Sequence, residues 1–156
     1  MGISPSQTAL DVQLSPPEND AVIAPLEPYL VDAATQTILI VDDDRSVADI
    51  FARMLKLEGF GVATALTAEA GLQLADEVGP DAILLDMRMP ITSGLQFLRL
   101  IRSRPALHDT PVAIVTGDYF LSDAIQQELR ALGASIRYKP LWLEDLIVLA
   151  KHLLRP

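Results

Sequence analysis

From Thr37 onward the chain alternates short apolar runs with longer stretches in which apolar residues recur every three or four positions. The runs are TILIV at 37–41, GVATA at 61–65, AILL at 82–85, PVAIV at 111–115 and ASIR at 134–137. The stretches that follow them have the period of amphipathic helices, and the last helix is expected over about 142–154. Five strands in strict alternation with five helices predict an α/β protein, a five-stranded parallel sheet wrapped by helices.

The first 36 residues do not follow this pattern. They hold five of the eleven prolines, and their five acidic residues without any basic residue give a net charge of −5. We expect a mostly disordered leader over 1–36 and a single folded domain over 37–156. The apolar segment at 21–31, AVIAPLEPYLV, can alternatively become ordered on a partner or on the chain's own domain. A solvated tail and a docking segment therefore both remain open.

Composition excludes several classes of protein. The absence of cysteine removes disulfides and thiolate metal sites. The net charge of −9, with no basic stripe, argues against non-specific nucleic-acid binding. The longest apolar runs have four or five residues, whereas a membrane-spanning helix needs about 20. The N-terminus also lacks the basic flank of a secretory signal, so we expect no membrane insertion and a cytoplasmic protein.

Polar residues of the types that bind ligands or take part in reactions follow four of the five predicted strands. In a parallel sheet wrapped by helices, ligands bind at the carboxyl ends of the strands, so these residues are expected at one edge. They are Asp42, Asp43 and Asp44 after the first strand, Asp86 after the third, Thr116 and Gly117 after the fourth, and Lys139 after the fifth. Each alone can be a turn, a helix cap or a surface residue, but their joint placement favours a site.

This set of residues suits phosphoryl transfer. Clustered carboxylates favour a hard divalent cation such as Mg²⁺, which prefers oxygen ligands. A lysine ammonium and a threonine hydroxyl can each contact a phosphoryl oxygen. A carboxylate can itself accept the phosphoryl group as an acyl phosphate, in a reaction that depends mainly on positioning and charge stabilisation.

The motifs ILIVDDD, ILLDMRMP followed by SG, AIVTG and YKP, in this order, resemble the receiver domain of bacterial two-component response regulators. The resemblance covers about residues 36–155. It implies a doubly wound five-stranded parallel sheet of the flavodoxin or CheY type. It also implies a signalling protein, rather than a metabolic enzyme, that takes a phosphoryl group from a histidine kinase or phosphotransfer protein.

Matched motif by motif, the resemblance assigns roles to individual residues. Asp86 would be the phosphoacceptor, Thr116 would reach the phosphoryl group, and Lys139 would neutralise it. The family's frequent cis peptide would precede Pro140, which is plausible because only bonds before proline adopt cis readily.

The metal site follows from the same resemblance. Asp42, Asp43 and Asp86 would hold Mg²⁺, or Mn²⁺ in its place, together with the backbone carbonyl of Arg88. Asp44 would instead begin the following helix, where a carboxylate interacts favourably with the helix dipole.

Two features depart from the family, and a third suggests an ion pair. The usual aromatic residue three positions before the lysine is Ile136 here, and Tyr138 adjoins the lysine instead. The stretch 116–133 is longer than usual. Arg88 and Asp118 each lie two residues after a site residue, and we hypothesise that they pair over the site and slow the entry of water.

Two other functions remain open. Asp42 and Asp44 also match the first motif of haloacid-dehalogenase-like phosphohydrolases, but the acidic pair Glu144 and Asp145, which that family needs at a strand end, falls in the last predicted helix. A receiver-like interaction module that is never phosphorylated is the other alternative, favoured by the departure at Ile136.

The output of the protein is less determined. Because the sequence stops at Pro156, directly after the last predicted helix, we expect a single-domain regulator that binds an unknown output protein or passes the phosphoryl group onward. Trp142 and Leu143 can join such a binding surface, or Trp142 can simply pack at the helix start. A homodimer is also possible.

Overall fold

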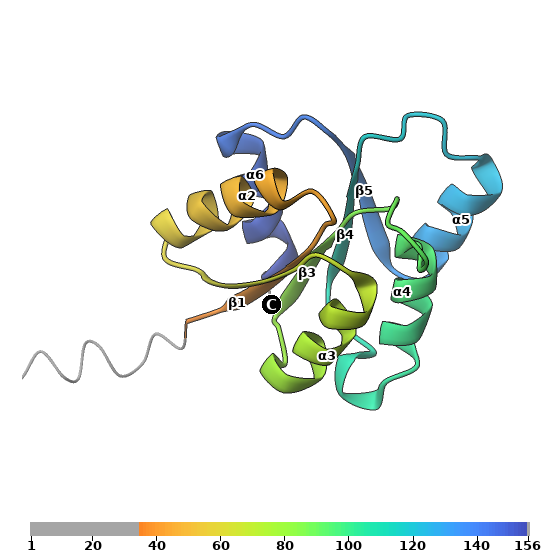
Figure 1. Ribbon diagram of the computed structural model, residues 1–156, viewed down its shortest axis with the longest axis horizontal. Coiled ribbons are helices and arrows are strands. Elements are labelled where there is room, and N and C mark those ends of the chain that lie inside the picture. Colours follow the sequence, from red (N-terminus) through yellow and green to blue (C-terminus); the bar gives the residue numbers. More distant parts are fainter. Residues whose placement is uncertain (1–34, 156) are drawn as a thin grey trace, which may run out of the picture. The chain divides into compact units, whose positions relative to one another are not determined.

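The computed structural model describes residues 35–155, and within them five strands form one sheet in the order β2-β1-β3-β4-β5 (Figure 1). All neighbouring strands run parallel. The strands are β1 (Thr37–Val41), β2 (Gly61–Ala65), β3 (Ala82–Leu85), β4 (Val112–Thr116) and β5 (Ala134–Tyr138). The predicted α/β fold is confirmed. β4 lies one residue later than predicted, and β5 continues one residue further.

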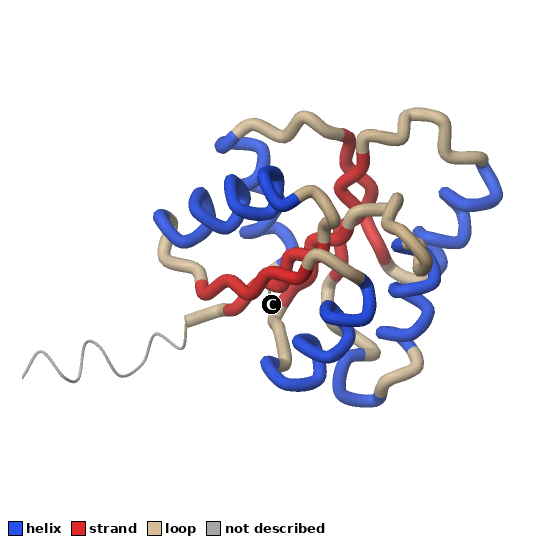
Figure 2. Tube along the Cα trace, viewed as in Figure 1, coloured by secondary structure: helices blue, strands red, loops and turns tan. Residues whose placement is uncertain are grey.

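A helix follows each strand (Figure 2). The helices are α2 (Arg45–Leu57), α3 (Ala68–Val78), α4 (Gly94–Arg102), α5 (Asp123–Ala131) and α6 (Leu143–Leu153), and a short 3₁₀ helix, η2 (Pro105–Leu107), precedes β4. The last helix falls within its predicted range. None of the helices in this part of the chain is long and apolar enough to cross a membrane.

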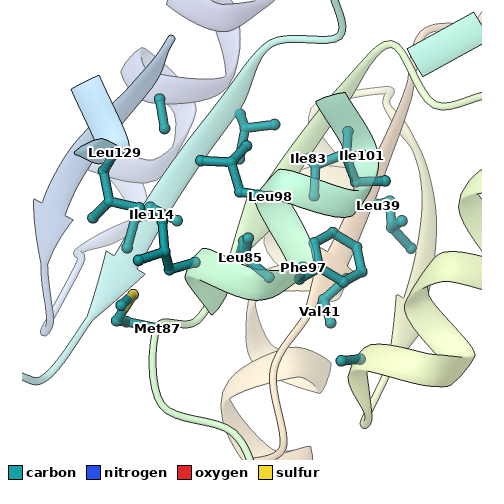
Figure 3. Close-up of a cluster of buried hydrophobic side chains, with 14 of the residues drawn as sticks. Leu39, Val41, Ile83, Leu85, Met87, Phe97, Leu98, Ile101, Ile114 and Leu129 are labelled. Carbon is teal, nitrogen blue, oxygen red and sulfur yellow. The ribbon is translucent and has the colours of Figure 1, made fainter. Parts of the chain in front are cut away.

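The helices cover both faces of the sheet, so the fold is doubly wound. Leu39 and Val41 of β1 belong to a core shared with α3, α4 and α5, whereas Ile38 and Ile40 belong to a second core shared with α2 and α6. This alternation follows from the period of two along a strand. Figure 3 shows the first core, in which α4 brings Phe97, Leu98 and Ile101 against the strands. The runs are nearly all apolar because both faces are buried.

Side-chain caps fix where the helices begin. Asp44 is the N-cap of α2, and its Oδ1 accepts hydrogen bonds from the backbone N–H groups of Ser46 (2.9 Å) and Val47 (3.2 Å). The prediction that Asp44 begins this helix is confirmed. Ser93 caps α4 in a reciprocal capping box with Gln96. These caps satisfy backbone donors that have no partner within the helix.

Gly94 lets α4 begin directly against the chain that leaves β3. Its N–H donates to the carbonyl of Met87 at 2.8 Å. A Cβ at this position would lie 2.5 Å from the carbonyl oxygen of Asp86 and 2.9 Å from the Cα of Met87. Only glycine permits this approach, which fixes the backbone that carries Asp86.

The connections from strand to strand lead to opposite edges of the sheet on the two sides of the boundary between β1 and β3. The first crossover leads from β1 outward to β2, and the later ones lead from β3 to β4 and β5. Ligands of such sheets bind at the carboxyl ends of the strands beside this point. Of the leader predicted over 1–36, only Thr35 and Gln36 are among the described residues, so that prediction and the docking segment at 21–31 are untested.

Candidate functional site

The residues predicted from the strand ends lie together in one open pocket of about 590 Å³. Its lining residues are Asp42, Asp43, Asp44, Asp86, Arg88, Thr116, Gly117, Asp118 and Lys139. They converge because the strands that carry them are parallel and adjacent. Val41 pairs with Leu85, for example, so the residues that follow these two strands are neighbours. Asp42, Asp86 and Thr116 are the buried polar residues of the described part, with exposures of 4%, 8% and 1%.

Three carboxylates form a compact cluster in this pocket. One oxygen from each of Asp42, Asp43 and Asp86 lies within 4.8 Å of the other two, and only Asp43 is exposed. Buried carboxylates are costly unless a positive charge compensates them. The donor set consists of hard oxygen atoms and fits Mg²⁺, which usually takes one or two carboxylates and keeps several waters.

Burial raises the pKa of the Asp86 carboxyl from 3.8 to about 6. The ammonium of Lys139 opposes this rise, whereas the carboxylates of Asp42 and Asp43 add to it. The backbone N–H of Arg88 donates to Asp86 and favours its ionised form. Asp86 is therefore a poorly solvated carboxylate that holds a proton to higher pH than an exposed aspartate does.

Lys139 reaches the cluster from the end of β5. Its Nζ lies 2.7 Å from Oδ2 of Asp42 and 3.7 Å from Oδ1 of Asp86. Its side chain is 22% exposed, so this ion pair is largely shielded from water. The peptide bond between Lys139 and Pro140 is cis, as predicted.

Thr116, the last residue of β4, points its hydroxyl at the same site. Its Oγ1 accepts a hydrogen bond from the N–H of Asp118 at 3.1 Å. Because the oxygen acts as an acceptor here, the hydroxyl proton can be donated to a ligand in the pocket.

The hypothesised pairing of Arg88 with Asp118 is present. Nε and one terminal nitrogen of the Arg88 guanidinium lie 2.7 Å and 2.6 Å from Oδ2 of Asp118. The N–H of Phe120, followed by the Arg88 side chain, holds the pKa of Asp118 below its usual value. Both residues line the pocket. The effect of the pair on water entry and the metal contact of the Arg88 carbonyl stay predictions.

Two aromatic side chains near Lys139 make a contact that the sequence did not reveal. Tyr138 stacks on Tyr119, with ring centroids 5.4 Å apart and an angle of 18° between the planes. Ile136 instead packs partly buried against the core. The available signal was Tyr119 in the lengthened stretch 116–133, but nothing in the sequence indicated which residue it would meet.

Other residues singled out in the sequence lie at the start of α6. Trp142 is its N-cap residue and is 71% exposed, so it does not pack there as one alternative supposed. Leu143 is 45% exposed. Glu144 and Asp145 lie in the first turn of α6 and not at a strand end, as the sequence indicated.

The chain matches the family model described as response regulator receiver domain over residues 38–149. It is 36% identical over 118 residues to the transcriptional regulatory protein PrrA of Mycobacterium bovis. The matched region covers 76% of this chain and 49% of PrrA. It is 34% identical over 121 residues to the response regulator MprA of Mycolicibacterium vanbaalenii, over 76% of this chain and 50% of MprA. The chain thus spans about half the length of these curated relatives.

Solved structures agree with this match. The chemotaxis protein CheY4 of Vibrio cholerae superposes with a TM-score of 0.71 at 28% identity, over 77% of this chain and 99% of CheY4. A CheY-like receiver domain protein of Methanospirillum hungatei gives a TM-score of 0.70 at 29% identity, over 78% of this chain and 94% of that one. With the fold, the strand-end residues and the sequence match in agreement, the chain belongs to the family of response regulator receiver domains of two-component signalling.

Proposed function

We propose that Asp86 accepts a phosphoryl group from a phosphohistidine of a histidine kinase or phosphotransfer protein, in a reaction that depends on Mg²⁺ or Mn²⁺. The observation that carries this proposal is the pocket that unites the carboxylate cluster of Asp42, Asp43 and Asp86 with Lys139 and Thr116. A cation and a lysine around a buried carboxylate are the charges that a transferring phosphoryl group requires.

In this mechanism a carboxylate oxygen of Asp86 attacks the phosphorus of the donor. The new P–O bond forms as the P–N bond breaks, and the imidazole nitrogen leaves with the electron pair and takes up a proton from solvent. The ammonium of Lys139, 3.7 Å from Oδ1 of Asp86, neutralises a phosphoryl oxygen. The hydroxyl of Thr116 donates to another. A cation held by the three aspartates would neutralise the charge shared by Asp86 and the phosphoryl group.

The phosphorylated protein would then signal through a surface that binds an output protein, or pass the phosphoryl group onward in a relay. It would act in the cytoplasm as a signalling phosphoacceptor that promotes only its own phosphorylation and dephosphorylation. The identity of its kinase and output protein requires a partner screen.

The test is incubation with acetyl phosphate, with and without Mg²⁺, followed by intact-mass measurement and peptide mapping. Wild type should gain a phosphoryl adduct on Asp86 only when Mg²⁺ is present. Asp86→Asn should gain none, and Asp42→Asn should lose most of the reaction. Asp109→Asn, which removes the same charge from a side chain that is fully exposed, is the matched control and should react like wild type.

Other outcomes would select another function. An adduct on Asp42, or phosphate release that survives Asp86→Asn, would support a phosphohydrolase. The absence of any adduct, when calorimetry shows that Mg²⁺ binds, would support the phosphorylation-independent interaction module. That second candidate is favoured by the partly buried Ile136 at the position where the family usually has an aromatic residue.

A further inference from the structure

Tyr119 links the connection after β4 to the chain that leaves β5, next to the site. It belongs to the connection between β4 and α5, and its hydroxyl donates a hydrogen bond to the backbone carbonyl of Lys139. Its ring stacks on Tyr138, the residue directly before that lysine. Tyr138 in turn is the register partner of Thr116 across β4 and β5. Tyr119 thus contacts the backbone of Lys139 and the side chain of Tyr138, whose backbone lies beside that of Thr116.

The residues on either side hold Tyr119 in place. The N–H of Asp118 donates to Oγ1 of Thr116 at 3.1 Å, and Oδ1 of Asp118 accepts from the N–H of Phe120 at 3.0 Å. The second of these is an Asx-type turn that encloses Tyr119. The carboxylate of Asp118 is itself anchored by Arg88. The position of Tyr119 therefore depends on the walls of the phosphorylation pocket.

The backbone of Lys139 is held at both of its polar groups. Its N–H donates to the carbonyl of Thr116 at 2.9 Å, and its carbonyl accepts from Tyr119. Pro140, the next residue, has no N–H with which to extend the ladder. Of the two contacts, only the one from Tyr119 comes from a side chain and can be removed by substitution.

We propose that Tyr119 is a positioning residue for Lys139. By fixing the carbonyl of Lys139, it holds the ammonium of that side chain between Asp42 and Asp86, where the distances are 2.7 Å and 3.7 Å. This inference rests on the proposed transfer to Asp86. It goes beyond that transfer because it gives Tyr119 the role of placing the lysine, in a chain whose usual aromatic position is occupied by Ile136.

The first test compares Tyr119→Phe with Tyr138→Phe by the initial rate of phosphorylation with acetyl phosphate at saturating Mg²⁺. Both substitutions keep the ring and remove one hydroxyl, but among the described residues only that of Tyr119 makes a hydrogen bond. Tyr119→Phe should be slower by about fivefold, the rate equivalent of one ordinary hydrogen bond. Tyr138→Phe should retain the wild-type rate.

A double-mutant cycle separates positioning from a general structural effect. If Tyr119 acts through Lys139, Tyr119→Phe should not slow the Lys139→Met variant any further. The proposal would be overturned by a wild-type rate in Tyr119→Phe, by equal losses in the two Phe variants, or by an undiminished effect of Tyr119→Phe in the Lys139→Met variant.

Calorimetric titration with Mg²⁺ gives a readout that needs no phosphorylation. The ammonium of Lys139 pairs with Asp42, one of the carboxylates that would hold the cation, so a loosened lysine should let Mg²⁺ bind more tightly to Tyr119→Phe than to Tyr138→Phe. Equal affinities would count against the proposal. If wild type is never phosphorylated on Asp86, the proposed function fails, and this titration alone decides the role of Tyr119.

Discussion

Asp86 combines two properties that oppose each other in an ordinary aspartate: it is buried, and the proposed reaction requires it to be charged. Its pKa of about 6 arises chiefly from burial, since transfer away from water penalises the ionised form. Above that pH the folded protein carries a buried charge in the pocket that Lys139 compensates only in part. A cation bound beside this buried carboxylate gains more electrostatic free energy than it would beside a carboxylate in water.

This raised pKa predicts a specific dependence of stability on pH. Because the folded state holds the Asp86 proton up to about pH 6 and the unfolded state only to about pH 4, the contribution of Asp86 to stability falls as the pH rises between these values. Relative to Asp86→Asn, wild type should lose about 1–2 kcal/mol from pH 4 to pH 7 after solvent screening. Urea denaturation of both proteins without divalent cations measures it, and a difference that stays constant with pH would contradict it.

The pair of Arg88 and Asp118 lies at the mouth of the same pocket. The Arg88 side chain is 76% exposed, whereas that of Asp118 is 8% exposed, so the arginine covers the carboxylate from the solvent side. If Asp86 is phosphorylated as proposed, we expect a group in this place to restrict the approach of water to the phosphoryl group.

Arg88→Ala should therefore shorten the lifetime of phosphorylated Asp86 by about threefold, in the range of one exposed ion pair. Decay of the phosphorylated form, followed on a phosphate-affinity gel, measures it. Arg99→Ala is the matched control, because Arg99 forms a similar exposed pair with Glu128 (2.5 Å) on α4 and α5, away from the pocket. An unchanged lifetime in Arg88→Ala, or an equal change in both variants, would refute the role of the pair.

Among the helices, α4 begins directly against the backbone that carries Asp86. Its first residue, Gly94, touches the backbone of Asp86, and its apolar face fills the core with Phe97, Leu98 and Ile101 (Figure 3). The helix can hold the chain after β3 in position only because no side chain separates them.

Gly94→Ala should lower the free energy of unfolding by about 3 kcal/mol, since the added methyl group meets backbone that cannot turn away. The control is Gly117→Ala, where a Cβ has nothing within 4 Å, and it should change stability by less than about 0.5 kcal/mol. Urea denaturation followed by circular dichroism compares the two. Equal stabilities would show that α4 can shift without cost.

At the scale of the whole molecule, the site is a product of topology. Asp42 and Asp86 are separated along the sequence by β2 and two helices, yet they are neighbours because β1 and β3 pair at the point where the chain reverses. Thr116 and Lys139 join them because β4 and β5 extend the sheet in the same direction. The ends of β1, β3, β4 and β5 supply these groups, so the pocket forms only when those four strands are paired.

The sequence by itself determined the elements and the membership of the pocket. The spacing of apolar residues along the sequence indicates which of them are buried, so the strands were predicted to within one residue. Asp44 was likewise recognisable as the start of a helix. Parallel strands place their carboxyl ends at one edge, which was enough to bring Asp42, Asp86, Thr116 and Lys139 together.

Only the tertiary structure decided the pairings within the pocket. Lys139 lies closer to Asp42 than to Asp86, a choice made between groups 97 and 53 residues away along the chain. The raised pKa of Asp86 depends on burial by several elements at once. The stack of Tyr119 on Tyr138 depends on the path of a loop. These properties are set by distances of a few ångströms between remote segments, and local sequence patterns do not encode such distances.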